Sequence, residues 1–207
     1  MRITKLVHSC LLVESDNQTA MIDPGAFSWQ SGLVDWNKIA RLDYLVVTHS
    51  HGDHLHQPFI EEIARRWPKV KLAANQEVTS QLETLGLEAA DDGVNTQFTA
   101  PHEALPGGEQ PPVNSGWHLF DRLTHPGDSL NFDETKEILA LPYVAPWGST
   151  TQAVELAKNL KPKAVVPIHD WHLSDTARDW YGGLLERALK PAGIKFVNLP
   201  NGQAVDI

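Results

Sequence analysis

The feature that most constrains this chain is a tract of three histidines and one aspartate within residues 48–54, Thr-His-Ser-His-Gly-Asp-His. It directly follows residues 42–47, a short apolar run that ends in two valines and predicts a buried strand. The tract therefore begins where a strand ends and the chain turns. Loops held by a rigid sheet are common places for metal ligands in enzymes. The chain is thus expected to fold around a metal site at the end of a strand.

The residue types in this tract suit zinc and chemically similar ions, because such ions bind neutral imidazole nitrogen and carboxylate oxygen. His49 and His51 are two residues apart, so their rings can reach one ion from an extended segment. Asp53 and His54 are adjacent, and a turn after Gly52 can bring them onto a second ion. Four ligands cannot complete two coordination shells, so further ligands must come from distant strand ends. The alternative is a chance histidine-rich tract or a solvated turn, which the full pattern after an apolar strand disfavours.

The tract resembles the metal-binding signature of the metallo-β-lactamase superfamily, and four further segments resemble other parts of that family in the same order. They are residues 12–25, which end in Asp-Pro-Gly, residues 99–102, residues 124–129 with a Gly-Asp-Ser turn, and residues 165–169. The resemblance implies that His102 and His169 are metal ligands and that Asp128 bridges two ions. It also implies an α/β fold, a single-domain four-layer αββα sandwich over residues 1–207 with two similar β-rich halves.

The periodicity of apolar residues predicts alternating strands and helices, which indicates a layered α/β architecture. Strands are expected at residues 2–14 with a bend near 8–10, 19–23, 43–47, 70–73, 97–100, 117–123, 138–141, 163–168 and 194–199. Helices are expected at residues 58–67, 76–85, 150–160 and 174–190. Residues 26–41 and 103–116 are expected to be loops.

Four more residues are expected near the site, each with an alternative role. Asp23 stands at a strand end, where it would support a metal ligand through a hydrogen bond or simply form a turn before proline. His8 is a pocket residue or a core histidine; the pocket is favoured by a resemblance to the compact hydrolase branch that includes ascorbate-6-phosphate lactonase. Trp147, in the proline-stiffened loop 142–148, would form a substrate wall. His172 is a pocket residue or a second proton carrier.

The composition limits which classes of binding partner and which cellular compartment are expected. The 207 residues carry 17 basic and 26 acidic side chains, a net charge of −9, which argues against binding nucleic acid or an anionic membrane. A small-molecule substrate is expected, and an anionic one is compatible because bound cations dominate the local field. Cys10 is the only cysteine, so no internal disulfide can form, which fits a reducing compartment. Without a recognisable signal peptide or membrane-spanning run, a cytoplasmic protein is expected, of undetermined oligomeric state.

Together these features predict a metal-dependent hydrolase of a small ester, lactone or phosphodiester. One ion would be held by His49, His51 and His102, the second by Asp53, His54 and His169, with Asp128 between them. Zn²⁺ is expected at both positions, with Mn²⁺, Fe or Ni²⁺ as alternatives. A hydroxide shared by the ions would attack the substrate, with Asp53 orienting it or moving its proton.

Two other function classes stay open. A di-iron redox protein could use the same ligands, although such chemistry usually needs an electron-carrier domain for which the chain has little room. A non-enzymatic metal-binding or regulatory protein could also have kept them. Measured turnover would distinguish an enzyme from a non-enzymatic metal-binding protein. Iron content would distinguish the redox protein from the hydrolase.

Overall fold

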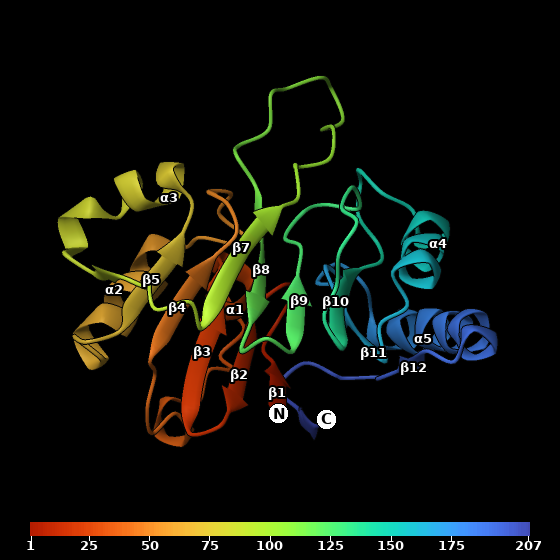
Figure 1. Cartoon of the computed structure of the whole chain (residues 1–207), viewed down its shortest axis with the longest axis horizontal. Coiled ribbons are helices and arrows are strands. Elements are labelled where there is room, and N and C mark those ends of the chain that lie inside the picture. The colour runs from red at the N-terminus through yellow and green to blue at the C-terminus, as the bar shows by residue number, and fades with distance from the viewer.

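A computed structural model that covers all 207 residues has two β-sheets packed face to face, with helices on both outer sides (Figure 1). The first sheet, in the order β13-β1-β2-β3-β4-β5-β6, contains β1 (Arg2–Lys5), β2 (Leu11–Ser15), β3 (Gln18–Ile22), β4 (Tyr44–Val47), β5 (Lys71–Ala74), β6 (Glu88–Ala89) and β13 (Ala204–Asp206). The second sheet, in the order β12-β11-β10-β9-β8-β7, contains β7 (Asn95–Thr99), β8 (Ser115–Leu119), β9 (Leu123–His125), β10 (Ile138–Pro142), β11 (Ala164–Ile168) and β12 (Lys195–Phe196).

The two sheets repeat one pairing pattern. From β1 to β6, two antiparallel pairs are followed by three parallel pairs. The same sequence of two antiparallel and three parallel pairs runs from β7 to β12. The two similar β-rich halves implied by the resemblance are therefore present.

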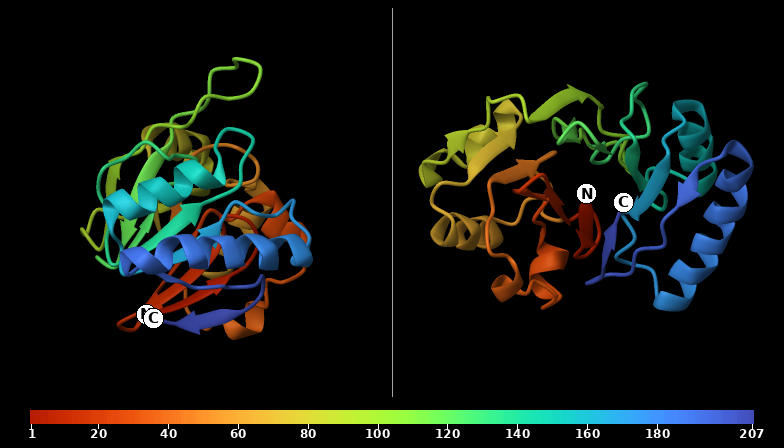
Figure 2. Two further views of the ribbon diagram at one scale, coloured as in Figure 1. Left: turned by 90° about the vertical axis from the view of Figure 1, so that its right-hand side faces the viewer. Right: turned by 60° about the horizontal axis from the view of Figure 1, so that its bottom comes forward.

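The helices lie outside the sheets and complete four layers. The first half contributes α1 (Ala26–Gln30), η1 (Trp36–Lys38), α2 (Gln57–Arg66), α3 (Gln76–Gln81) and η2 (Glu83–Leu85). The second half contributes α4 (Thr150–Leu160), α5 (Asp175–Leu189) and η3 (Lys190–Ala192). Figure 2 shows α4 and α5 side by side on one outer face and α2 on the other side of the molecule. The predicted αββα sandwich is confirmed.

The apolar core follows these layers because successive strand residues point to opposite faces. In β4, Val46 packs in the cluster between the sheets, whereas Leu45 and Val47 pack in the cluster that reaches α2. In β10, Ala140 faces the other sheet, whereas Leu139 joins the cluster with α4 and α5. These central strands are buried on both faces, which is why they are continuous apolar runs in the sequence.

Local signals explain the two helices that were predicted most closely. Helix α2 has Pro58 in its first turn, where a missing N–H costs nothing, and Arg65 and Arg66 in its last turn, near the negative end of the helix dipole. Helix α4 begins with a capping box, in which the side chains of Ser149 and Gln152 each accept a hydrogen bond from the backbone N–H of the other residue.

Residues 26–41 were predicted to be a loop, which is wrong in part. The five residues of α1 form a helix that has no side-chain cap, so no sequence signal marks its start. Trp36, in η1, packs edge-on against Phe59 of α2 with ring centroids 5.6 Å apart and lies under Arg66. This segment is therefore packed onto the outer helix layer.

The single strand predicted at residues 117–123 is two strands, β8 and β9. Phe120 and Asp121 both have left-handed backbone angles, with φ of 52° and 54°, and form the turn between them. The strand predicted at 194–199 is reduced to the two residues of β12, and β6 and β13 were not predicted. β13 pairs with β1, so the two chain ends lie together, as both views in Figure 2 show.

No helix in the structure is long and apolar enough to cross a membrane.

Candidate metal centre

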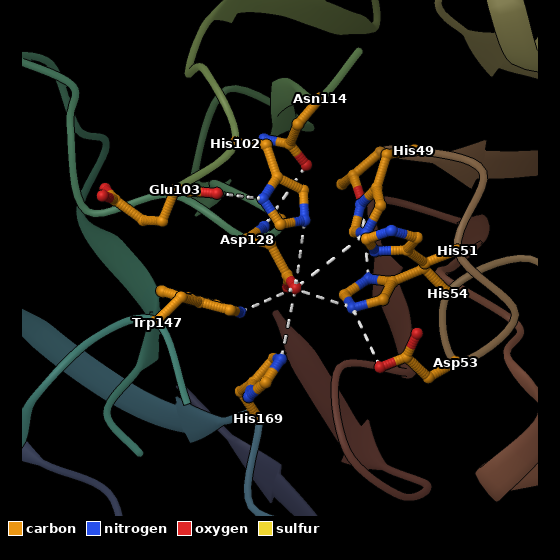
Figure 3. A network of polar contacts seen from close by, with 12 residues as sticks. His49, His51, Asp53, His54, His102, Glu103, Asn114, Asp128, Trp147 and His169 are labelled. Atoms are coloured by element: carbon orange, nitrogen blue, oxygen red, sulfur yellow. Dashed lines mark hydrogen bonds and ion pairs between the residues drawn. The ribbon is translucent and has the colours of Figure 1, made fainter. Parts of the chain in front are cut away.

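The ends of four strands meet at one edge of the sandwich, and the residues just after them carry the predicted ligands (Figure 3). Strand β4 leads into the histidine tract, β7 leads to His102, β9 to Asp128 and β11 to His169. All seven residues predicted as ligands are brought together there: His49, His51, Asp53, His54, His102, Asp128 and His169.

One set of donors, which we call the His49 group, consists of His49, His51, His102 and Asp128. One ligand atom from each residue lies within 4.8 Å of the others. His49 Nε2 is 3.2 Å from His51 Nδ1, and His102 Nε2 is 3.6 Å from Asp128 Oδ2. Donors placed tetrahedrally around zinc at its usual bond lengths are roughly 3.3 Å apart. The two distances are therefore of the size that donors to one divalent ion require.

The second set, the His54 group, consists of His8, Asp53, His54 and His169, again with ligand atoms within 4.8 Å of one another. Asp128 lies between the two groups. Its Oδ1 is 3.0 Å from His54 Nε2, and its Oδ2 is 3.3 Å from His169 Nε2. Asp128 therefore lies within 3.6 Å of donors from both groups.

His8 lies closer to the donors than its two sequence-based alternatives suggest. Its Nε2 is 3.2 Å from Asp53 Oδ2, and its ring centroid is 4.1 Å from that of His169. The residue is fully buried and has a left-handed backbone with φ of 64°. That turn points the ring into the centre, and no residue pattern in the sequence signals it.

The buried donors fit metal ions because no hydrogen bond of good geometry satisfies their inner atoms, although several of these atoms lie only 3.0–3.3 Å from a neighbouring donor. These atoms are both ring nitrogens of His8, Nε2 of His54, His102 and His169, and Oδ1 of Asp128. Buried polar atoms are nearly always paired, and leaving one unpaired costs about 1–3 kcal/mol. A divalent ion in each group would satisfy these atoms together.

The outer nitrogens of the histidines, in contrast, are held by the protein. Nδ1 of His54 donates to Asp23 Oδ2 at 2.7 Å, Nδ1 of His102 to the Glu103 carbonyl at 2.7 Å, and Nδ1 of His169 to the Val144 carbonyl at 3.1 Å. Such bonds fix the ring orientation and leave Nε2 to bind the metal.

Asp23 does more than turn the chain. It is fully buried, and its Oδ1 accepts a hydrogen bond from the Thr48 N–H at 2.8 Å while Oδ2 accepts one from His54. One carboxylate therefore fixes both the start of the histidine tract and the ring of one donor.

The pKa values of the donors indicate a centre that favours bound cations. Burial lowers the pKa of His49 well below its usual value and that of His8 to about 4. Burial alone would lower the pKa of His54, but Asp128, Asp23 and Asp53 together raise it well above its usual value. The carboxylates around His54 thus favour a positive charge at this position, which a metal ion would supply.

Two asparagines that the sequence did not single out fix the loops around the centre. Asn114 donates to the Ala100 carbonyl at 2.6 Å and to the Pro126 carbonyl at 2.9 Å, and it accepts from the Asp128 N–H at 3.2 Å. Asn75 donates to the Thr48 carbonyl at 3.1 Å. Asparagine is common in loops, so nothing in its position alone could have identified either role.

Two glycines are required by close packing at this edge. Gly127, next to Asp128, has φ of 61°, and a Cβ there would collide with Asn114 and Thr48. A Cβ on Gly25 would collide with the backbone carbonyl of Asp53. The Asp-Pro-Gly and Gly-Asp-Ser segments therefore serve the site through their glycines as well as their aspartates.

A buried ion pair joins the two sheets beside the centre. Lys5 Nζ in β1 lies 2.7 Å from Asp170 Oδ2, and both side chains are almost completely buried. Burial lowers the pKa of Lys5, and Asp170 acts in the opposite direction. Because Asp170 directly follows His169, the pair fixes the backbone that presents this histidine.

A cavity of about 590 Å³ opens over the centre. Its wall includes Phe27, Leu105, Val144, Trp147, Trp171 and His172. Trp147 Nε1 also donates to Asp128 Oδ2 at 3.2 Å. Trp147 and His172 thus lie at the pocket, where the sequence placed them. A slightly larger cavity, about 610 Å³, lies near the opposite ends of β3 and β4 and contains none of the donors.

Comparisons with known proteins find relatives of this chain. Residues 2–169 match the family described as the Beta-lactamase superfamily domain. Protein Rv0786c of Mycobacterium tuberculosis is 29% identical over 198 residues, which cover 89% of this chain and 91% of that protein. A UPF0173 metal-dependent hydrolase of Thermofilum pendens is 31% identical over 149 residues, 63% of each chain.

The fold also occurs among solved structures. Igni18, a metallo hydrolase from the archaeon Ignicoccus hospitalis, superposes with a TM-score of 0.72 at 20% identity. The superposition covers 100% of this chain and 98% of that one, so the whole αββα sandwich is shared.

Proposed function

The chain belongs to the beta-lactamase superfamily as a metal-dependent hydrolase, and we propose that it cleaves a small ester, lactone or phosphodiester with a water activated between two divalent ions. The observation that carries this proposal is the pair of adjacent donor groups, with Asp128 of the His49 group 3.0 Å and 3.3 Å from the His54 and His169 nitrogens of the other. The net charge of −9 supports a small-molecule substrate over a nucleic acid.

We assign the His49 group to one ion and the His54 group to the other, with Asp128 contacting both. His8 joins Asp53, His54 and His169 in this assignment, because its ring nitrogen lies among their ligand atoms. Zn²⁺ is proposed for both positions, since imidazole and carboxylate donors at this spacing suit it, and Mn²⁺, Fe and Ni²⁺ are the alternatives.

When bound, two such ions lower the pKa of a shared water to about 7 and polarise the substrate oxygen. Asp53 is the group we assign to orienting the nucleophile, because its side chain is 28% exposed at the cavity, against 4% for Asp128. Burial would raise the pKa of Asp53, but His54 and His8 outweigh it and lower this pKa well below its usual value. Asp53 is thus ionised at neutral pH, so its carboxylate can accept a hydrogen bond from the nucleophile; movement of the nucleophile's proton is the alternative role.

The experiment that tests this proposal is elemental analysis of untagged protein purified without chelator. We expect about two equivalents of zinc or manganese per chain, as in other two-metal sites. Two of iron, together with colour, would favour the redox alternative. No metal after reconstitution would contradict the proposed mechanism.

The same measurement on Asp128→Ala tests the bridging role. We expect this variant to lose at least one of the two ions and most turnover of ester, lactone and phosphodiester substrates. Asp133→Ala, which removes an exposed aspartate from the loop that follows the same turn, is the matched control and should keep both. Full metal content in Asp128→Ala would show that this residue is not a shared ligand.

A further inference from the structure

We propose that the substrate of this site is an uncharged ester or lactone that carries an apolar alkyl or aryl group beside the scissile bond. The inference rests on the proposed function and selects among the substrate classes that it allows. It comes from the walls of the cavity over the metal centre, which are mostly apolar and contain no lysine or arginine that would bind an anionic group away from the ions.

One wall is built by two aromatic rings from distant parts of the chain. Phe27 of α1 and Trp171, which follows β11, stack with ring centroids 4.0 Å apart and an angle of 21° between the planes. Trp171 is still 45% exposed, although large aromatic side chains gain free energy when they are covered. An apolar group that enters the cavity can cover this exposed ring.

A second part of the cavity wall is also apolar and extends to the metal-binding donors. It consists of Val144, Ala145, Pro146 and Trp147 in the loop between β10 and α4, and Leu105 lines the cavity from the loop after β7. The Trp147 ring lies edge-on to His169, with centroids 5.0 Å apart, and Figure 3 shows its nitrogen directed at Asp128. The substrate group next to the scissile bond would therefore contact apolar side chains immediately beside the ions.

No lysine or arginine lines this cavity. The ionisable groups in its wall are the donors His51, Asp53, Asp128 and His169, together with His172, which is exposed. A phosphate or carboxylate placed away from the ions would lose water without gaining a cationic partner.

Arg178 of α5, which contacts the Trp171 loop, is held by the backbone of that loop and by Asp175. Arg178 donates to the Asp170 carbonyl at 3.2 Å and to the Trp171 carbonyl at 3.4 Å, and it does not line the cavity. The charge distribution therefore disfavours phosphorylated sugars and other substrates with a second anionic group. A volume of about 590 Å³ suits a small molecule with an alkyl chain or one aromatic ring.

The test uses hydroxamates, which bind zinc but are not hydrolysed by the expected reaction, on the zinc-loaded protein. Acetohydroxamate, hexanohydroxamate and adipic monohydroxamate differ only in what fills the cavity, and the last replaces the terminal methyl group of the second by a carboxylate. Full burial of one methylene raises affinity about fourfold. We expect calorimetry to show that hexanohydroxamate binds at least roughly tenfold more tightly than acetohydroxamate, on the same basis. The adipic compound should gain little or nothing.

Two exposed tryptophans provide matched variants. Trp171→Ala should remove most of the gain in affinity that the longer alkyl chain brings. Trp180, on α5, is 61% exposed and lies outside the cavity, so Trp180→Ala should leave this gain unchanged. Equal or tighter binding of the adipic compound, or no effect of chain length, would overturn the inference. If the gain in affinity is unchanged in Trp171→Ala, then Trp171 does not contact the alkyl chain.

Hydrolysis of the matching 4-nitrophenyl hexanoate and 4-nitrophenyl adipate separates the two proposals. Preference for the hexanoate supports both. Preference for the adipate keeps the hydrolase but overturns the apolar substrate. Binding that favours hexanohydroxamate, with no hydrolysis of any ester, lactone or phosphodiester, would overturn the proposed function and leave an apolar ligand site.

Discussion

At the scale of single residues, the centre depends on what each histidine contacts on the side away from the ions. Asp23 accepts the Nδ1 proton of His54, which leaves Nε2, 3.0 Å from Asp128 Oδ1, as the nitrogen that would bind an ion. In Asp23→Asn the amide N–H₂ can face Nδ1 instead, which moves the ring proton to Nε2, toward the ion. We expect affinity for the ion at the His54 group to fall roughly 10–100-fold. Titration of zinc against a fluorescent chelator measures this loss.

Asp43→Asn is the control for that substitution. Asp43 also accepts a backbone hydrogen bond, from the Thr19 N–H at 2.9 Å, but it precedes β4 whereas Asp23 contacts the segment that follows β4. Its variant should bind both ions normally. Nitrogen NMR of the His54 ring would show the tautomer change only in Asp23→Asn, and an unchanged ring with weakened binding would contradict the proposed cause.

The same scale shows where sequence reasoning succeeds and where it stops. His49, His51, Asp53 and His54 were predicted because they are close together in the chain and directly follow a recognisable strand. His8 was left between two roles, since its place among the donors depends on a left-handed backbone that no neighbouring residue signals.

At the scale of elements, the loops after β7 and β9 are joined by one side chain. Asn114→Ala would leave the buried carbonyls of Ala100 and Pro126 without their donor. An unpaired buried group costs about 1–3 kcal/mol, so we expect the free energy of unfolding to fall by roughly 2–4 kcal/mol. Urea denaturation measures the loss, and weaker zinc binding should accompany it because His102 and Asp128 lie in these loops.

Asn95→Ala gives the comparison that isolates this role. Asn95, in β7, is as buried as Asn114, but neither its side-chain oxygen nor its nitrogen has a hydrogen-bond partner. Its replacement should change the free energy of unfolding by less than about 1 kcal/mol. Equal losses in the two variants would mean that burial, and not the hydrogen bonds of Asn114, stabilises the loops.

Most elements could be predicted because their apolar periodicity is strong and their caps are local. The break between β8 and β9 was missed, although Phe120 and Asp121 invert the apolar–polar alternation of Trp117 to Leu119 at the point where the backbone turns back. Short elements such as α1 and β13 depend on tertiary contacts with α2 or β1, and these contacts leave no periodic pattern over three to five residues.

At the scale of the whole molecule, the centre joins the two sheets. The histidine tract follows a strand of the first sheet, whereas His102, Asp128 and His169 follow strands of the second. These three ligands could be predicted because each follows an expected strand and matches a segment of the family that the chain resembles. The ion pair of Lys5 and Asp170 could not be predicted, since residues 165 positions apart meet only through the packing of the sheets.

Metal removal should therefore loosen the contact between the sheets. An ion that binds only the folded chain, at a concentration 100 times its dissociation constant, stabilises it by about 2.7 kcal/mol. For a chain of this size each kcal/mol shifts Tm by roughly 2–4 °C, so chelation should lower Tm by at least about 5 °C. Calorimetry before and after chelation measures the shift, and added zinc should restore the original Tm. If elemental analysis verified that the metal was gone and the melting curve did not move, the ions would contribute nothing to the stability of the sandwich. The buried ion pair and the apolar layer between the sheets would then hold the two halves together without them.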